Sequence, residues 1–133
     1  ALTARAGFDT SLVIRGVEGG VVPSLRQKGL MISYVGDKEK ARVEIDPKAM
    51  GIQQELRAIV FPQYLSVDNK TALAEHTVTL GKAALSGERG MFYDGLVCTT
   101  SLILWHLEKF KYLSDAAEHV REVLDSGLVL NRL

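Results

Sequence analysis

A glycine-rich turn after a predicted strand carries the residues best suited to chemistry. It reads Arg15-Gly16-Val17-Glu18-Gly19-Gly20, with three glycines in the five positions after Arg15. Glycines at a strand end let backbone N–H groups approach a ligand, and a nearby carboxylate suits a phosphate or a metal–phosphate complex. The candidate binding residues are therefore Arg15, Gly16, Glu18 and Gly19, with Glu18 as a weak metal ligand. A tight turn with a local Arg15–Glu18 pair explains the same pattern more simply.

Basic residues concentrate in the first third of the chain, at Arg15, Arg26, Lys28, Lys38, Lys40 and Arg42. Such a cluster can contact nucleic-acid phosphates, and the candidate contacts are Arg15, Arg26, Lys28 and Arg42. Aromatic side chains are not regularly interleaved with these residues. That favours a solvated surface over a nucleic-acid groove, so both interpretations stay open.

Few side chains have the spacing of a metal site or a catalytic nucleophile. His76, His106 and His119 fall on three separate predicted helices, without a Cys or His partner at metal-ligand spacing. His106 is expected to be a core histidine satisfied by a backbone carbonyl. Cys98, the single cysteine, lies in an apolar stretch and is expected to be a structural thiol. A free thiol favours a reducing compartment, so the expected location is the cytoplasm.

Length and composition indicate one globular domain. The chain has 133 residues, of which 47% are apolar and 24% charged. Sixteen basic and sixteen acidic side chains cancel, so the overall charge gives no reason to expect nucleic acid or an anionic membrane. The sequence has no signal peptide and no transmembrane run, so no membrane partner is expected. The opening ALTARAGFDT lacks an initiating Met and any helix or strand pattern, which is typical of a fragment.

The first half is predicted to be rich in strands. Residues 10–15 indicate a buried strand, and residues 30–35 and 42–45 a hairpin around a polar loop at 36–40. Asp46 and Pro47 are expected to open a single helical turn that Gly51 closes. Residues 58–61 could form another strand.

Three helices are predicted in the second half. The first is capped by Asp68 or Ser66 and ends at Ser86. The central helix, at about 94–108, is apolar around most of its circumference and is expected to be enclosed on several sides. The third is capped by Ser114 and stopped by Gly127. The predicted fold is therefore α/β and α+β-like, with a hairpin followed by three helices, as one part of a larger α/β domain.

Several segments together resemble the C-terminal part of the anthranilate phosphoribosyltransferase family, within the fold group of class II nucleoside phosphorylases and family 3 glycosyl transferases. They are, in order, SLVIRG with its Gly/acid turn, IDPKAMGI, LSGERG, YDGLV and LSDAAEHVREVLDSGLVLNRL. The resemblance covers nearly all of residues 1–133, taken as a single C-terminal domain or fragment. The Arg15-to-Gly19 turn looks closest to a divergent branch, some of whose members are implicated in nucleic-acid binding.

The resemblance implies a larger parent protein whose N-terminal portion is missing here. That portion holds the family's glycine-rich loop for phosphoribosyl pyrophosphate, so the chain alone is expected not to catalyse transfer. Within the matching region, Glu18 would be the remaining metal-side carboxylate and Arg15 a diphosphate contact. The family's adjacent Asp-Glu pair for Mg²⁺ is reduced to Glu18, and a single carboxylate is a poor site for that ion. Mg²⁺ is accordingly expected only in the parent, and none with this chain alone.

Three hypotheses about function remain at this stage. The first is a glycosyl or phosphoribosyl transferase-like portion that binds a phosphorylated sugar in the parent protein. The second is a non-enzymatic nucleic-acid binder of the same fold group. The third is a structural domain that forms a homodimer, because the apolar tail at 128–133 would be exposed.

Overall fold

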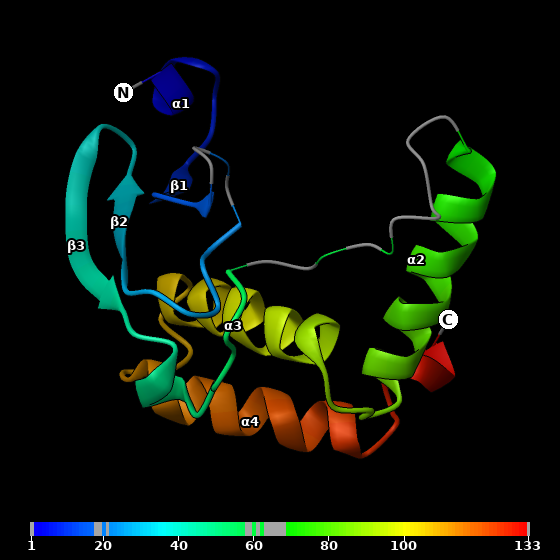
Figure 1. Ribbon diagram of the computed structural model, residues 1–133. Helices are drawn as coiled ribbons and strands as arrows, with labels where there is room; N and C mark the ends of the chain where they lie inside the picture. Colours follow the sequence, from blue (N-terminus) through cyan, green and yellow to red (C-terminus); the bar gives the residue numbers. More distant parts are fainter. Residues whose placement is uncertain are drawn as a thin grey trace.

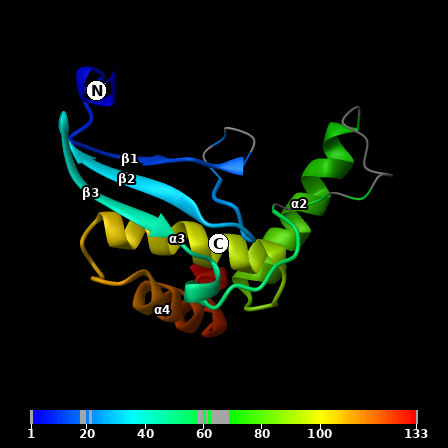
Figure 2. The same ribbon diagram turned by 60° about the vertical axis from the view of Figure 1, so that its left-hand side comes forward.

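The computed structural model describes residues 2–17, 20, 22–57, 60, 62 and 69–132. A three-stranded sheet, the helix α3 and the helix α4 lie one below the other, while α2 extends to the side (Figures 1 and 2). Strands occupy the first half and the long helices the second half, so the predicted mixed α/β class is confirmed.

The sheet is an antiparallel meander in the order β1-β2-β3, built from Thr10–Ile14, Gly29–Val35 and Lys38–Ile45. Met31 lies opposite both Ile14 and Val43, and these side chains face α3. The register shifts between Ser33 and Tyr34. The sheet therefore has one face in the core and one face outward, as the alternation in the second hairpin strand predicted.

Two predicted details of the sheet were wrong. The first strand was expected to be buried, but β1 is an edge strand and Val13 is 49% exposed. The polar loop was expected to span 36–40, but the turn takes only Gly36 and Asp37, and β3 already begins at Lys38. The side chains of the charged residues in the first part of β3 are exposed to solvent, while the backbone of the same residues pairs with β2. A charged segment can therefore form an edge strand without burying its charges.

The chain also contains short helical pieces outside the sheet and the long helices. The N-terminal segment, which was predicted to lack regular structure, forms the single turn α1 at Leu2–Arg5. The predicted turn after Asp46 is present as η2 at Lys48–Met50, closed by Gly51 at φ 75°. The tail contains η3 at Leu130–Arg132; Leu128 is 63% exposed, whereas Val129 packs against the core.

The three predicted helices are α2, α3 and α4, at Lys70–Leu85, Met91–His106 and Leu113–Asp125. Two predicted caps were wrong. Asn69 caps α2, because its side chain accepts a hydrogen bond from the Ala72 amide. The predicted caps, Asp68 and Ser66, lie outside the described part of the chain. So do most of residues 58–61, where another strand was predicted. Ser114 lies inside α4 and bonds Asp115, so Tyr112 precedes the helix without a side-chain cap. Gly127 has φ 70° just after α4, as predicted.

The core is organised around α3. Within this helix only Thr99 and Ile103 are exposed, which confirms a helix enclosed on several sides. Its buried residues meet the sheet on one side and α4 on the other; they are Tyr93, Val97, Cys98, Ser101 and Leu102. Among the helices that the described residues form, none is long and apolar enough to cross a membrane.

Candidate functional site

A basic hollow of about 450 Å³ lies where β1 ends and β2 begins. Three of the residues picked out from the sequence, Arg15, Gly16 and Lys28, line it together. The pairing of β1 with β2 brings them together, since the Arg15 amide donates to the carbonyl of Leu30. The remaining lining residues are Val17, Ser24, Gln27, Gly29, Leu30 and Arg57.

Arg57 was not identified from the sequence. The Leu25 amide donates to the Arg57 carbonyl at 3.1 Å, which ties the segment before residue 58 to the loop before β2. This bond joins positions 32 residues apart, and no local pattern around Arg57 marks it. Only the folded chain reveals Arg57 as the second arginine of the hollow.

The hollow carries an excess of positive charge. Lys28 is bonded to Glu44 at 2.7 Å and lies 3.3 Å from Asp46, and these two carboxylates raise the pKa of its ammonium group. Arg15 and Arg57 have no acidic partner among the residues that the structure describes. No described carboxylate neutralises these two guanidinium groups, and guanidinium is well shaped to bind phosphate through paired hydrogen bonds.

Gly16 is required by the shape of the turn. A Cβ atom there would lie 2.0 Å from the Gly20 carbonyl oxygen and 2.7 Å from that of Val22. The turn is closed by the Val17 amide donating to Val22 at 2.8 Å and by the Gly20 amide donating to Val17 at 2.9 Å. Any larger residue at position 16 would push this loop away from the hollow.

Glu18 and Gly19, the other two candidates of the turn, lie outside the described residues. Among the described side chains that line the hollow there is no carboxylate, and the nearby Glu44 is engaged by Lys28. Among the residues described, no three His, Cys, Asp or Glu side chains are grouped to hold a metal. The lining as described therefore does not fit Mg²⁺, and fits an anion.

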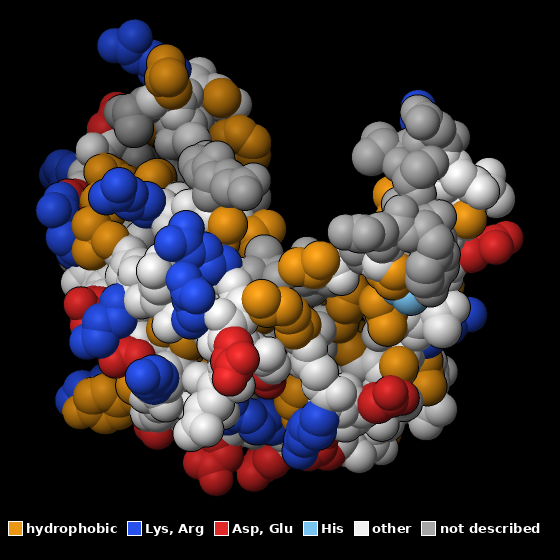
Figure 3. Space-filling model, in the orientation of Figure 1, with side chains coloured by type: hydrophobic (Ala, Val, Ile, Leu, Met, Phe, Trp, Pro, Cys, Tyr) orange, Lys and Arg blue, Asp and Glu red, His pale blue; other side chains and the backbone are white. Residues whose placement is uncertain are grey.

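The four candidate nucleic-acid contacts are divided. Arg26 lines an adjoining hollow with Lys48 and donates to the Glu55 carbonyl at 3.2 Å. Arg42 is elsewhere, on the outer face of β3, bonded twice to Glu39 at 3.2 and 3.0 Å. Figure 3 shows Lys and Arg side chains gathered over the sheet side of one face, with acidic side chains along its lower edge. The structure thus brings Arg15 and Lys28 together in one hollow, places Arg26 in a second one and leaves Arg42 outside both.

Cys98 is enclosed in the core, with no exposed surface. Burial, and then the charge of Asp94, raise the pKa of its thiol to about 12. The thiol is therefore protonated at neutral pH and cannot act as a nucleophile. This matches its prediction as a structural thiol.

His106 was expected to bond a backbone carbonyl, and this was wrong. Its Nδ1 lies 2.7 Å from the Ser33 hydroxyl oxygen, so the bond joins the end of α3 to the middle of β2. Ser33 is only 2% exposed, and its hydroxyl is engaged by the imidazole. The Ser–His pair therefore links sheet and helix and does not form a catalytic dyad.

The stability of the fold is expected to depend on pH through His106. Burial, and then the charge of Lys40, lower the pKa of this imidazole below its ordinary value of 6.5. Between the lowered pKa of the folded state and the ordinary pKa of the unfolded chain, the unfolded chain binds more protons at His106. The contribution of His106 to the free energy of unfolding is therefore complete above about pH 6.5 and is lost as the pH falls through the pKa of the folded state. Urea unfolding between pH 5 and 7.5 should show the difference between the wild type and His106→Gln shrinking at low pH. A difference that stays constant with pH would contradict this.

Comparison with known proteins gives one kind of relative. The chain is 28% identical over 126 residues to anthranilate phosphoribosyltransferases from two strains of Dehalococcoides mccartyi. The match covers 92% of this chain and 34% of each relative, so the chain spans about a third of the length of the curated relatives it matches. No family model matches the sequence, and no solved structure matches at a significant level. The chain is therefore phosphoribosyltransferase-like in sequence, which confirms its resemblance to anthranilate phosphoribosyltransferase.

Proposed function

We propose that the chain is the anion-binding α/β portion of a glycosyl or phosphoribosyl transferase-like protein that works in the cytoplasm. In the longer protein, the basic hollow would hold the diphosphate of a phosphoribosyl pyrophosphate-type ligand. The observation that carries the proposal is the convergence of Arg15, Lys28 and Arg57 on one hollow at the end of β1. The curated relatives support it, since their name specifies a phosphoribosyl transfer.

The contribution to catalysis would be positioning and charge neutralisation. A diphosphate leaving group gains negative charge as its bond to the sugar breaks, and fixed cations stabilise that charge. Arg15 and Arg57 can supply this stabilisation because neither is neutralised by a described carboxylate. The acceptor would bind elsewhere in the longer protein, so the 133-residue chain is expected to bind the ligand without turning it over.

Isothermal titration of the chain with inorganic pyrophosphate, without divalent metal, tests the proposal. Replacing Arg15 or Arg57 by alanine should weaken binding at least tenfold each, because a hydrogen bond to a charged group contributes about 1.5–3 kcal/mol. Lys82→Ala is the matched control, since this exposed cation lies on α2 and does not line the hollow. Equal losses in all three variants, or no pyrophosphate binding at all, would reject the hollow as the site.

Glu18 is proposed to add a metal-dependent part to this binding in the full-length protein. Repeating the titration with phosphoribosyl pyrophosphate and Mg²⁺ separates the two contributions. Glu18→Ala should abolish any gain from Mg²⁺ and leave the metal-free affinity unchanged. A Mg²⁺ effect that survives the substitution would remove Glu18 from the site.

A second candidate function is binding to a single-stranded nucleic acid. It is favoured by the adjoining hollow, which is lined by two cations, Arg26 and Lys48, and one carboxylate, Glu55, and so adds a net positive charge to that of the first hollow. Affinity for an oligonucleotide should then fall steeply with salt, and the log–log slope should flatten when Arg15, Arg26 or Lys28 is replaced. Arg42, which lines neither of the two hollows, should change the slope less. Pyrophosphate binding without oligonucleotide binding would reject this candidate.

A further inference from the structure

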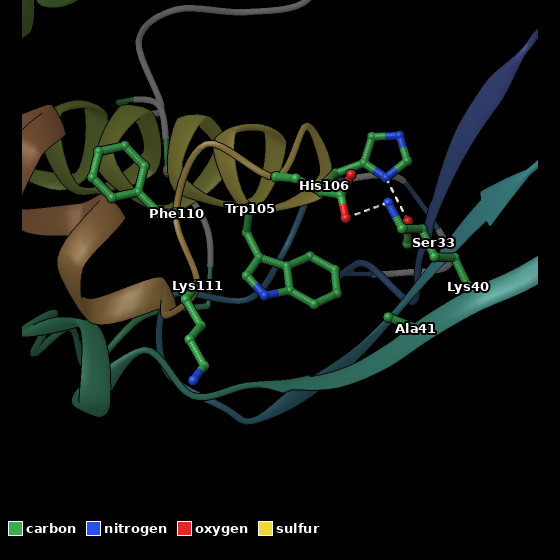
Figure 4. A pocket seen from close by; sticks show the side chains of 8 residues that line it. Ser33, Lys40, Ala41, Trp105, His106, Phe110 and Lys111 are labelled. Atoms are coloured by element: carbon green, nitrogen blue, oxygen red, sulfur yellow. Dashed lines mark hydrogen bonds and ion pairs between the residues drawn. The ribbon is translucent and has the colours of Figure 1, made fainter.

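An apolar hollow of about 270 Å³ lies where the end of α2, the middle of α3, the second half of α4 and the C-terminal tail meet. It is separate from the basic hollow and from a hollow of about 330 Å³ between the end of α3 and strands β2 and β3, which Figure 4 shows. It shares no lining residue with either of them. Its place between helices is one where small-molecule pockets are common.

The wall of this apolar hollow is almost wholly aliphatic. Of its nine described lining residues seven are Leu or Val, and none is Lys, Arg, Asp or Glu. Val120 and Leu124 form a buried floor, at 6% and 5% exposure, while Leu96, Leu104 and Val129 are partly buried around it. A charged ligand would lose its hydration here without gaining an ionic partner. The lining therefore selects a neutral, apolar ligand.

Two polar side chains interrupt this wall, Thr100 on α3 and His119 on α4. Elsewhere in the helices, the hydroxyls of Thr77, Thr79 and Ser101 each donate to the carbonyl four residues earlier, at 2.8, 2.9 and 2.5 Å. Thr100 makes no such bond. Neither its hydroxyl nor the ring nitrogens of His119 have a hydrogen-bond partner among the described residues. Both groups can therefore bond a ligand inside an otherwise apolar wall.

Contacts outside the apolar hollow hold its walls in place. The ring of His119 packs against Phe110, which is labelled in Figure 4, with centroids 5.2 Å apart. The end of α2 lies against the end of α4, because a Cβ atom on Gly87 would be 3.2 Å from a carboxylate oxygen of Asp125. Gly127, at φ 70°, turns the chain after α4, and the tail that follows packs against the core. The hollow is thus preformed, which lowers the entropy lost when a ligand binds.

The volume of the apolar hollow limits the size of its ligand. An apolar cavity of about 150 Å³ is large enough to bind benzene. A hollow of about 270 Å³ therefore admits a six-membered ring with a short aliphatic substituent. A hydroxyl on such a ring both donates and accepts, so it can bond the Thr100 hydroxyl or a His119 nitrogen.

We propose that this hollow binds a small neutral aliphatic alcohol of the size of an alkyl-substituted cyclohexanol. The ring would lie against the leucines and valines, with the hydroxyl at Thr100 and His119. The ligand would touch three helices, of which α2 is the least well packed: of its 16 residues, all within the described part of the chain, only Ala84 is buried. A bound alcohol would add contacts at the end by which α2, extended to the side in Figure 1, joins the fold.

Methyl NMR of the chain, labelled with ¹³C at Leu and Val, measures this binding and locates it. Titration with 4-methylcyclohexanol should shift the methyl signals of Leu104, Val123 and Val129 along one saturable curve. The signals of Val13 and Val35, which are exposed on the sheet, should stay unchanged. Cyclohexanecarboxylate, which has a similar size but carries a charge, should bind at least tenfold more weakly.

Three outcomes of this titration would overturn the proposal. The first is the absence of a saturable shift, and the second is a shift of equal size at the sheet valines. The third is a shift of the lining methyl groups when the protein concentration is raised without alcohol, which would show that a second copy of the chain fills the hollow.

Two matched pairs of substitutions test the residues assigned to the site. Thr100→Val keeps the shape of the side chain and removes its hydroxyl, so it should weaken binding about fivefold. Thr99→Val is its control, since Thr99 is exposed on the same helix and does not line the hollow. Val123→Phe should fill the hollow and abolish binding, whereas Val78→Phe, at an exposed position of α2, should not. An affinity that Val123→Phe leaves intact, or that both threonine variants change equally, would show that the hollow is not the site.

Discussion

Replacing Leu102 with alanine is expected to lower the free energy of unfolding by about 3 kcal/mol. Leu102 has no exposed surface and lies on α3, the helix between the sheet and α4. Truncation removes three carbon atoms from a close-packed site, and neighbours on three elements cannot all move in to fill the gap. Since domains of this size are stabilised by only about 5–15 kcal/mol, the loss should be plain in urea unfolding followed by circular dichroism.

The neighbouring residue provides the control for Leu102. Ile103 is one position further along the same helix but is 46% exposed. Ile103→Ala should therefore change the free energy of unfolding by about 0.5 kcal/mol or less. If the two substitutions destabilised the chain equally, α3 would not be the centre of the core.

Local sequence patterns were enough to predict the three strands and the three long helices. The alternation at 42–45 located the second strand of the hairpin. The spacing of five residues predicted the apolar face of α4: Ala116, Ala117, Val120, Val123 and Leu124. All of them are buried except Val123, which is partly buried. The predictions that were wrong concern the position of β1 in the sheet and the residues that cap the helices. A strand of Leu, Val and Ile has the same composition whether it lies at the centre or the edge of a sheet, and β1 proved to be at the edge. Asn, Asp and Ser all suit a helix cap, so the choice of Asn69 depends on where the backbone bends.

The sites were predictable only where a local pattern marked them. We could identify Arg15, Gly16 and Lys28 from the sequence because Arg15 and Gly16 lie at the end of the first predicted strand and Lys28 lies just before the next one. The place of Arg57 in the basic hollow depends on its bond to Leu25, which lies 32 residues earlier in the chain. The bond between Ser33 and His106 joins residues that are 73 positions apart. No periodicity encodes such a pair, because each partner has an ordinary sequence context. The hollow between the end of α3 and strands β2 and β3 was missed for the same reason: Ser33, Lys40 and Ala41 come from the first half of the chain, and its other lining residues come from the second half.

The second large effect is expected at Asp125, the last residue of α4. Its carboxylate accepts from the Tyr93 hydroxyl at 2.8 Å and from both terminal nitrogens of Arg89, at 2.9 and 2.8 Å. The guanidinium of Arg89 also lies 4.2 Å from the centre of the Tyr93 ring. Asp125 thus ties the start of α3 to the end of α4 through one buried and one exposed partner.

Asp125→Ala is expected to lower the free energy of unfolding by about 2 kcal/mol. Tyr93 is only 1% exposed, and a buried hydroxyl left without a partner costs about 1–3 kcal/mol. The ion pair with Arg89, whose side chain is 61% exposed, adds less than about 1 kcal/mol. Removing a negative charge from the C-terminus of a helix stabilises the fold by about 0.3–1 kcal/mol. This gain nearly cancels the loss of the ion pair with Arg89. The Tyr93 hydroxyl therefore decides the result, which urea unfolding measures.

A double-mutant cycle separates the hydroxyl from the ion pair. In a Tyr93→Phe background no buried hydroxyl remains at this position, so Asp125→Ala should then cost less than about 1 kcal/mol. Arg89→Ala alone should have a similarly small effect, because it leaves the bond from Tyr93 to Asp125 intact. If Asp125→Ala cost as much in the Tyr93→Phe background as in the wild type, the exposed ion pair would be the stabilising contact. The ordering of these variants thus tests whether burial, more than charge, sets the strength of this link between the two helices.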